Sequence, residues 1–345
     1  MIKIELSKYT LEKHLNYCMG TEVGANKHRK SLYALLQNKI EHCTDENLKE
    51  ILTFIYKNFE RLVIGNPYEL DDIKETISKK VNNIVMKEYL QEHQKRKEDE
   101  IKAVLESIFV AEYERFSNRN VLNNNLWWAY TFVQNLNISV CPYCNSQFIF
   151  TYLSKEGKTR PVLDHFFCKS KYPYLAISIY NLVPCCKVCN SDFKGSIECD
   201  LINYINPYIH EFEGKVLFKR SVTEERSQKG KKDYFSAIIG KSDDFNITLD
   251  YNNLAKELVP QYKKHAEVFH IEEIYEYHKN YVKDIINKSS IYNDIYTNQL
   301  KSSYIKLFQN DEDLRQVLIP REDQMNNIIL SKLTRDIINM ELKSE

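Results

Sequence analysis

Two pairs of cysteines, each with the spacing Cys-x2-Cys, constrain this chain more than any other feature. Cys141 and Cys144 form the first pair, and Cys186 and Cys189 form the second. Nine cysteines placed at random in 345 residues would produce roughly 0.2 pairs with this spacing. Two such turns can direct four thiolates at one point and make the closed tetrahedral site that holds structural zinc. We therefore predict a zinc ion bound by these four side chains.

Other roles for the cysteines are less favoured. Cysteine is often buried, so free core thiols are the plain alternative, and a redox role would require both pairs to be redox pairs. Cys185 precedes Cys186 and offers a competing thiol, but only Cys186 has the Cys-x2-Cys spacing. An odd number of cysteines in a chain without an export signal argues against a disulfide framework.

The composition favours long helices. Glycine and proline number 8 each in 345 residues, which is about 2.3% for each. The usual fractions are ~7% and ~5%, so few residues are available for the tight turns of an all-β fold. Hydrophobic residues make up 43% of the chain, enough for a large core, and the length allows roughly two or three domains. No apolar run approaches the ~20 residues of a membrane span, and the first residues are too polar for a signal peptide. We expect a cytoplasmic protein that does not enter a membrane.

Three regions differ in their sequence pattern. Residues 1–137 carry apolar side chains at helical spacing, most clearly over 101–116, and Gly65-Asn66-Pro67 marks a turn. Residues 138–210 contain both cysteine pairs, and residues 211–345 become helical again after a short mixed stretch. We therefore predict a mainly α fold with a small α+β insert between two helical regions.

The insert is expected to contain a β-hairpin. Residues 148–153 alternate in the manner of a strand, 154–158 have the composition of a turn, and 160–166 would return as the second strand. Asp164 and His165 lie at the end of this second strand. Neighbouring strand residues point to opposite faces, so these two side chains share a site only if the strand twists or bulges there. The tail from Cys186 can form a short helix.

The order of the motifs CPYC, LDHF, YPYLAISIYNLVPCCKVCN and SDFKG closely resembles the HNH, or ββα-metal, endonuclease family. The resemblance covers roughly residues 138–196 and points to the subgroup in which two cysteine knuckles hold a structural zinc around the nuclease core. The segments 270–278 and 330–337 resemble, more weakly, the HNH nuclease subunit of Septu-type and related retron anti-phage defence systems. That subunit works with an ABC/SMC-like ATPase, so the resemblance implies such a partner here.

The resemblance implies a role for each of four residues. His165 matches the general base, whose imidazole can take a proton from water. Asp164 matches the carboxylate that holds the catalytic Mg²⁺, with Mn²⁺ as a close rival, and Asn190 would add an amide oxygen. Asn181 matches the asparagine that orients the histidine and braces the loop.

The binding surface for nucleic acid is less well marked. The formal net charge is zero, but Lys215 to Lys232 holds seven basic and two acidic residues, which can form a strand and loop that follow a phosphate backbone. A solvated surface loop is an equally good interpretation. The neutral net charge also fits a subunit that borrows its affinity from a partner. The candidate phosphate contacts are Lys194, Lys215, Lys219, Arg220, Lys229, Lys231 and Lys232.

Two functions remain from this reasoning, and a bare interaction scaffold, in which the cysteines alone matter, is a third. The first is a metal-dependent endonuclease, with DNA as the expected substrate and RNA as an alternative. The second is a catalytically silent, zinc-stabilised module that binds nucleic acid or protein. The presence of Asp164, His165, Asn181 and Asn190 together favours the enzyme, because a decayed site need not preserve them.

Overall fold

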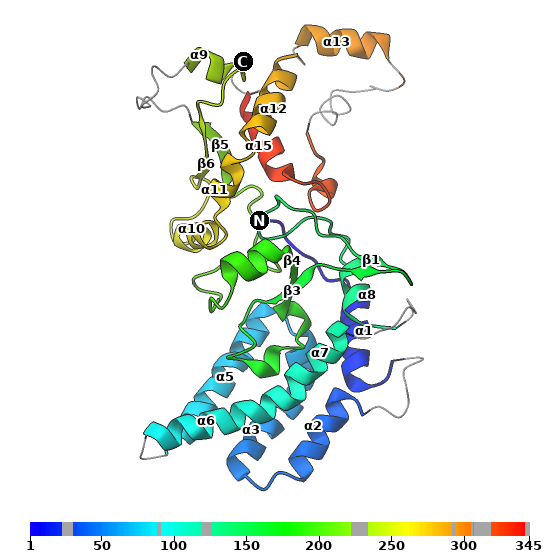
Figure 1. Ribbon diagram of the computed structural model, residues 1–345, viewed down its shortest axis with the longest axis vertical. Helices are drawn as coiled ribbons and strands as arrows, with labels where there is room; N and C mark the ends of the chain where they lie inside the picture. Colours follow the sequence, from blue (N-terminus) through cyan, green and yellow to red (C-terminus); the bar gives the residue numbers. More distant parts are fainter. Residues whose placement is uncertain are drawn as a thin grey trace. The chain divides into compact units, whose positions relative to one another are not determined.

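The computed structural model describes residues 1–22, 30–87, 91–118, 126–221, 234–291, 294–304, 306 and 319–341 (Figure 1). The chain forms two compact units, each assembled from separate stretches of sequence. Unit 1 contains Met1–Ile2, Ser139–Phe148 and His210–Glu345, and unit 2 contains Lys3–Ile138 and Ile149–Ile209. The chain is mainly helical with small antiparallel sheets, which confirms the predicted fold class at that level.

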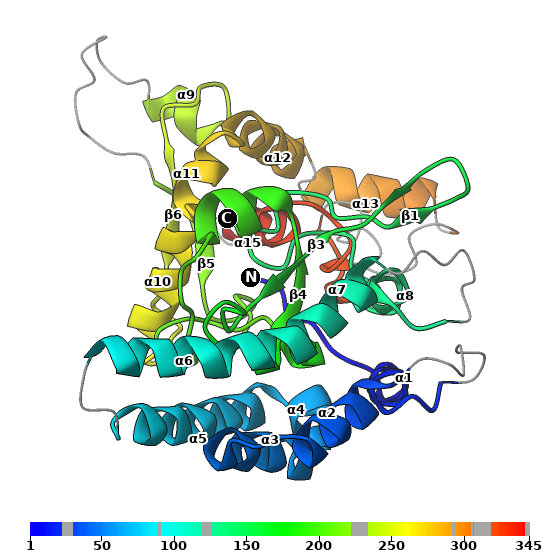
Figure 2. The same ribbon diagram turned by 60° about the horizontal axis from the view of Figure 1, so that its bottom comes forward.

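Unit 2 begins with a group of packed helices. Figure 2 shows α2, α3 and α5 side by side, with α6 along α5. The helices are α1 (Lys8–Met19), α2 (Leu32–Glu41), α3 (Glu46–Lys57), α4 (Phe59–Ile64), α5 (Pro67–Val85), α6 (Gln91–Leu105), α7 (Ala111–Asn118) and α8 (Ala129–Gln134). Their apolar faces supply most of the buried core of this unit.

The turn predicted at Gly65-Asn66-Pro67 separates α4 from α5. The Asn66 side chain accepts hydrogen bonds from the backbone of the first turn of α5, and Glu69 reaches back to the Asn66 N–H at 2.9 Å. This reciprocal capping and the proline at the first helical position start the helix. A Cβ at Gly65 would lie 2.1 Å from the carbonyl oxygen of Arg61, so only glycine fits this close approach.

The apolar stripe predicted over 101–116 forms one continuous helical run with a π-helical centre. α6 passes into the π-helix η1 (Glu106–Val110) and then into α7. Ile101, Phe109 and Phe116 are buried along it. π-helical turns are rare and often occur at functional sites, and here η1 packs against the short 3₁₀ helix η2 (Pro173–Leu175).

The strands of unit 2 pair differently from the predicted hairpin. β1 (Tyr152–Leu153) pairs with β2 (Lys158–Thr159) across the predicted turn, but β3 (Val162–His165) pairs with β4 (Leu182–Cys185), which follows the 3₁₀ helix η3 (Ile179–Asn181). Pro161 separates β2 from β3 and lacks the N–H that a continued ladder would need. The return strand is therefore divided, and its second half forms a sheet with residues just before the second cysteine pair.

Unit 1 contains a two-stranded antiparallel sheet with helices packed against it. β5 (Leu217–Ser221) pairs with β6 (Asn246–Asp250). The helix α15 (Ser331–Glu341) packs on β5 and on α12 (Lys279–Ile291), and the Asp336 carboxylate accepts the Phe218 N–H at 2.8 Å. The remaining elements in the described residues of this unit are α9 (Tyr234–Ile238), α10 (Val259–Val268), α11 (Ile271–Glu276), α13 (Asp294–Ser303) and η5 (Glu322–Gln324).

The two units do not follow the three predicted regions. Residues 139–148, which carry the first cysteine pair, belong with the C-terminal helices, while most of the remaining insert belongs with the N-terminal helices. The unit boundaries therefore fall inside the segment that the sequence pattern treats as one insert. Within the described part of the chain, every helix is too short or too polar to cross a membrane.

Candidate metal centre and catalytic cluster

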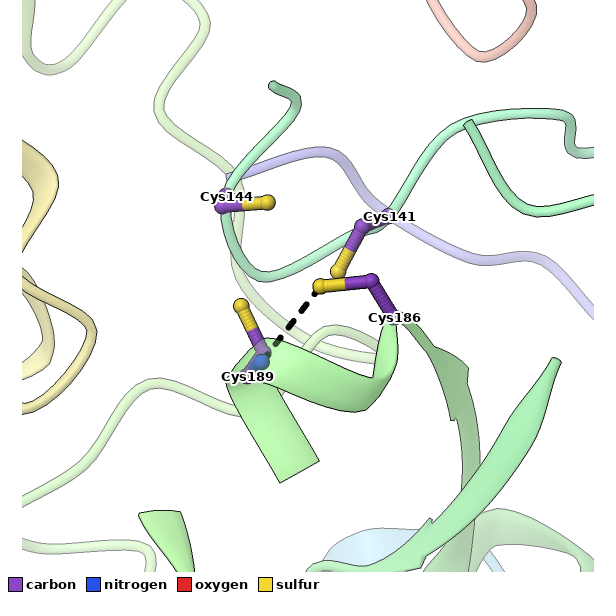
Figure 3. A group of neighbouring side chains, drawn as sticks. All are labelled: Cys141, Cys144, Cys186 and Cys189. Carbon is purple, nitrogen blue, oxygen red and sulfur yellow. Dashed lines mark hydrogen bonds between the residues drawn. The ribbon is translucent and has the colours of Figure 1, made fainter. Parts of the chain in front are cut away.

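The first cysteine turn is closed by its own backbone. Cys141 donates its N–H to the carbonyl of Gln147 at 2.9 Å, and Asn145 donates its N–H to the carbonyl of Cys141 at 2.8 Å. Asn145 has φ 53°, a left-handed conformation that asparagine adopts more readily than most residues. The turn thereby directs Cys141 and Cys144 at one small region (Figure 3).

Side chains distant in sequence but within unit 1 hold this turn in place. The Tyr275 hydroxyl of α11 donates to the Cys144 carbonyl at 2.8 Å. At the start of α15, the Ser331 hydroxyl and the Lys332 N–H both donate to the Asn145 amide oxygen at 3.2 Å. The segments 270–278 and 330–337, which the resemblance marked outside the core, therefore include residues that support the first cysteine turn.

The second cysteine turn lies at the junction of β4 and the π-helix η4 (Val188–Lys194). Cys189 donates its backbone N–H to the Cys186 sulfur at 3.4 Å, a contact that favours a negatively charged sulfur. The neighbouring Cys185 lies in β4 opposite Val162 and is fully buried. Burial, followed by the nearby Asp164 carboxylate, raises the pKa of the Cys185 thiol well above its usual range.

The sulfur atoms of Cys141, Cys144, Cys186 and Cys189 all lie within 4.8 Å of one another (Figure 3). A tetrahedral ion with metal–sulfur bonds of about 2.3 Å requires sulfurs about 3.8 Å apart, so a small contraction of this group would complete a site. Among the described residues, this is the one such group of metal-ligating side chains. None of the nine cysteines, which all lie in described segments, forms a disulfide. The four buried thiols can therefore bind a metal ion.

Asp164 and His165 end β3, and both side chains are buried. The His165 Nε2 lies 3.0 Å from the Ala176 carbonyl oxygen. Burial, and then the charge of Lys169, lowers the pKa of His165 to about 3, so the imidazole is neutral near pH 7. A carbonyl oxygen can only accept a hydrogen bond, so Nε2 carries the proton and Nδ1 keeps its lone pair.

Lys194 lies inside unit 2 and not on a helix surface. Its Nζ donates to Asp164 Oδ1 at 2.8 Å and to the His165 carbonyl at 2.9 Å, and its side chain is 2% exposed. Burial by itself lowers the pKa of Lys194, but the Asp164 carboxylate more than offsets this, and the net pKa is raised. Lys194 therefore joins η4 to the end of β3 and does not offer its charge to solvent.

The two asparagines have different surroundings. Asn181 is fully buried; its amide oxygen accepts the Phe167 N–H at 2.7 Å, and its NH₂ donates to the carbonyls of Phe167 and Leu175. It therefore braces the loop after His165. Asn190 is half-buried on η4, and its NH₂ donates to the Ser191 hydroxyl at 3.3 Å.

Tyr113 and Lys169 lie beside His165. Neither residue is among the site residues that the sequence predicts. The Tyr113 ring of α7 packs edge-to-face on His165 with centroids 4.5 Å apart, and the Lys169 Nζ lies 5.0 Å from the centre of the Tyr113 ring. In the sequence, Tyr113 is one more apolar position of a helical stripe. No local signal marked it, because its role depends on where β3 packs.

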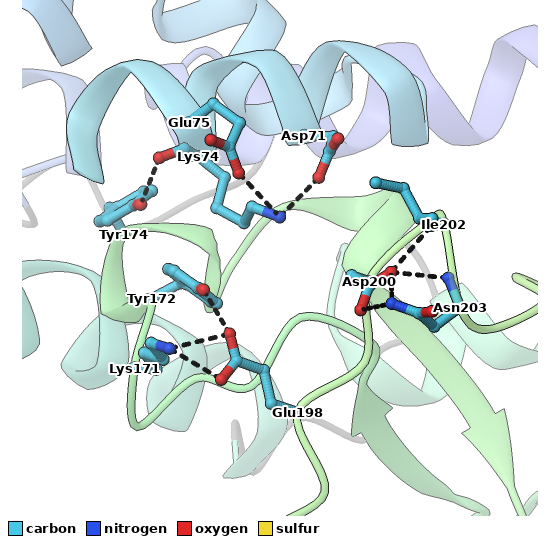
Figure 4. A network of polar contacts seen from close by, with 10 residues as sticks. All are labelled: Asp71, Lys74, Glu75, Lys171, Tyr172, Tyr174, Glu198, Asp200, Ile202 and Asn203. Carbon is cyan, nitrogen blue, oxygen red and sulfur yellow. Dashed lines mark hydrogen bonds and ion pairs between the residues drawn. The ribbon is translucent and has the colours of Figure 1, made fainter. Parts of the chain in front are cut away.

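A polar network fixes the loop that contains the YPYL motif (Figure 4). Lys74 of α5 pairs with Asp71 at 2.6 Å, and its ammonium group lies over the Tyr172 ring at 5.6 Å. The Tyr172 hydroxyl donates to Glu198 at 2.6 Å, and Tyr174 donates to the Lys74 carbonyl at 3.4 Å. The loop that supplies the Ala176 carbonyl to His165 is therefore attached to the helical part of the unit.

Two of the other candidate phosphate contacts, Lys219 and Arg220, are engaged by partners within unit 1. Lys219 pairs with Asp250, and Arg220 donates to the Ala237 carbonyl and to Glu341 at 2.7 and 2.8 Å. Lys215 is half-buried. The predicted strand in this stretch is β5, while Lys229, Lys231 and Lys232 lie outside the described residues.

Comparison of the chain with protein-family models, with curated proteins and with solved structures finds no match.

Proposed function

We propose that this chain is a metal-dependent endonuclease of the HNH type, which hydrolyses phosphodiester bonds in the cytoplasm, with DNA as the preferred substrate. The observation that carries the proposal is the order strand, strand, helix in unit 2. The antiparallel pair β3 and β4 is followed directly by η4, and the motif residues Asp164, His165 and Asn190 stand on these elements. This order matches the ββα arrangement for which the family is named.

The geometry of His165 supports its role as the general base. Because Nε2–H is bonded to the Ala176 carbonyl, the ring is held in one tautomer with Nδ1 as the acceptor for a water proton. A bound phosphodiester would bring negative charge near the ring and raise the pKa of His165 toward the range of an effective base. Tyr113 restricts the ring from one side.

The donor chemistry of Asp164 and Asn190 fits a hard divalent cation. Mg²⁺ binds one or two protein oxygens and keeps several waters, and when bound it would supply positive charge to the transition state. A carboxylate offers about four lone-pair positions, so Asp164 can hold a cation while it accepts the hydrogen bond from Lys194. Lys194 would fix the direction of the carboxylate.

We propose zinc as the ion of the four-cysteine group. A site with four thiolates and no further ligand suits structural zinc. Its role would be to stabilise the two cysteine turns, because metal binding to such a group contributes directly to folding. The resemblance to the Septu-type and retron-associated nuclease subunit further supports an anti-phage role with an ABC/SMC-like ATPase as partner.

One observation favours the silent binding module as the second candidate. The ammonium group of Lys194 already neutralises Asp164 at 2.8 Å, in the way a resident cation would. A carboxylate whose charge is fully satisfied by a buried lysine has less affinity for a metal ion. The two functions differ in whether Mg²⁺ or Mn²⁺ activates the protein.

The test is cleavage of supercoiled plasmid and of total RNA by the purified chain with Mg²⁺ or Mn²⁺, with EDTA in parallel. His165→Ala should abolish cutting without loss of the fold. His93→Ala is the matched control, because His93 is an exposed histidine on α6 of the same unit. Cutting that survives in His165→Ala would refute the assignment of the base. Absence of metal-dependent cutting, both alone and with a native ATPase partner recovered by pull-down, would favour the binding module.

A further inference from the structure

Two exposed aromatic rings lie at the start of the β1–β2 hairpin of unit 2. Phe150 and Tyr152 are 66% and 54% exposed, while Thr151 and Leu153 between and after them are half-buried. The two rings are two residues apart in the chain, Phe150 just before β1 and Tyr152 at its first position. Large aromatic side chains are costly to leave in water, and two on one narrow ribbon indicate a binding surface.

The charges on the same hairpin favour an anionic ligand. Lys155 and Lys158 are exposed in and just after the turn, against one exposed acid, Glu156. Lysine side chains are long and can reach past the edge of a two-stranded ribbon. Aromatic rings combined with lysines form the surface that proteins use for unpaired nucleotides, since bases stack on the rings while the phosphates meet the positive charges.

The hairpin is also adjacent in the chain to the candidate catalytic cluster. β2 ends at Thr159, and β3 carries Asp164 and His165 after a break at Pro161. From Lys158 to Asp164 the extended chain covers about 20 Å at ~3.3 Å per residue. A nucleic-acid strand covers this distance with about six nucleotides at 3.4 Å each. One strand can therefore reach both places.

We propose that Phe150, Tyr152 and Lys155 bind unpaired nucleotides, so that single-stranded nucleic acid, or a single-stranded stretch beside a duplex, is the substrate class of this chain. The inference rests on the proposed nuclease function. A duplex hides the faces of its bases in the stack, and opening it costs free energy. The rings therefore select strands whose bases are already unpaired.

The test is a binding measurement that does not require cleavage. Fluorescence anisotropy with a labelled oligothymidylate of about 20 nucleotides, in EDTA and low salt, is compared with a duplex of equal length. The wild-type chain should bind the single strand more tightly. Phe150→Ala with Tyr152→Ala should weaken single-strand binding by about tenfold or more, and should affect the duplex much less. Tyr68→Ala, a 61% exposed tyrosine on α5 of the same unit, is the matched control and should change neither.

Unchanged single-strand binding in the double variant would overturn the inference, and so would equal wild-type affinity for single strand and duplex. A loss of binding to a protein partner with full retention of oligonucleotide binding would likewise overturn it. Because His165→Ala is assayed separately for cleavage, a chain that cuts without needing the rings refutes only this inference. A chain that binds through the rings and never cuts refutes only the nuclease.

Discussion

Replacing Lys194 with methionine should destabilise unit 2 strongly. The Lys194 and Asp164 side chains are 2% and 5% exposed, and their Nζ and Oδ1 atoms are 2.8 Å apart. Methionine keeps most of the length of the side chain and removes the charge. Asp164 would then remain as a buried carboxylate without its cation, and the His165 carbonyl would lose the hydrogen bond from Nζ.

The magnitude follows from burial. At 2.8 Å and an effective dielectric constant of about 20, the attraction between the two charges is about 6 kcal/mol. Part of the lost attraction is offset, because the free-energy cost of burying the ammonium group is also absent in the variant. Breaking a buried pair by removing one partner costs about 3–5 kcal/mol. Lys171→Met is the matched control: Lys171 pairs with Glu198 at 2.7 Å, but the side chains are 58% and 45% exposed, so its loss should cost about 0–1 kcal/mol.

The assay is hydrogen exchange measured by mass spectrometry on peptides that cover β3 and β4, because it reports the opening of this unit alone. Lys194→Met should speed the slowest amides by about 10² to nearly 10⁴-fold, from about 1.4 kcal/mol for each factor of ten. Adding Asp164→Asn should restore most of the protection, since no unpaired charge is then buried. An effect of Lys194→Met no larger than that of Lys171→Met would refute the reasoning, as would a double variant that exchanges as fast as the single one.

Three further results are expected. Cys144→Ser should lower the zinc content of purified protein well below one ion per chain, as measured by mass spectrometry of the metal, and unchanged zinc would exclude the four-cysteine site. Asn181→Leu should cost about 2–4 kcal/mol in chemical unfolding, because the Phe167 N–H and the Leu175 carbonyl lose buried partners; a change below 1 kcal/mol would show that the loop is held by other contacts. Burial lowers the pKa of His14 to about 4. Between pH 6.5 and 4 this histidine is therefore protonated in the unfolded chain and neutral in the folded chain. The stability that His14 contributes above pH 6.5 should therefore fall by about 3 kcal/mol between pH 6.5 and 4, in addition to the loss from other buried histidines such as His165. His14→Gln should remove the His14 part of the slope, whereas an unchanged slope would contradict the assignment.

The sequence was most informative where the relevant physics is local. A Cys-x2-Cys turn brings two thiols together whatever surrounds it, so the spacing alone selected the four sulfurs that lie within 4.8 Å of one another. The Gly65-Asn66-Pro67 turn and the stripe over 101–116 are likewise set by neighbouring residues along the chain. Helical periodicity could not show that the centre of the stripe is π-helical, because that depends on what packs against it.

Strand pairing was the point at which sequence reasoning failed. The alternation over 148–153 and 160–166 predicts one hairpin, but β3 pairs with β4. Alternation shows that a segment can form a strand and does not identify the neighbour that satisfies its backbone. The division at Pro161 follows from its missing N–H, a signal that the sequence itself contains.

The sequence by itself determined the candidate residues of this chain: four thiols at paired spacing, an Asp-His dipeptide and two asparagines in a fixed order. Only the tertiary structure decided how they are held. It buried Lys194 against Asp164, placed Tyr113 on His165, and supplied the Ala176 carbonyl that sets the tautomer of the imidazole. These contacts join residues 11 to 52 positions apart in the chain, and such pairs form only where packed helices and strands bring them together.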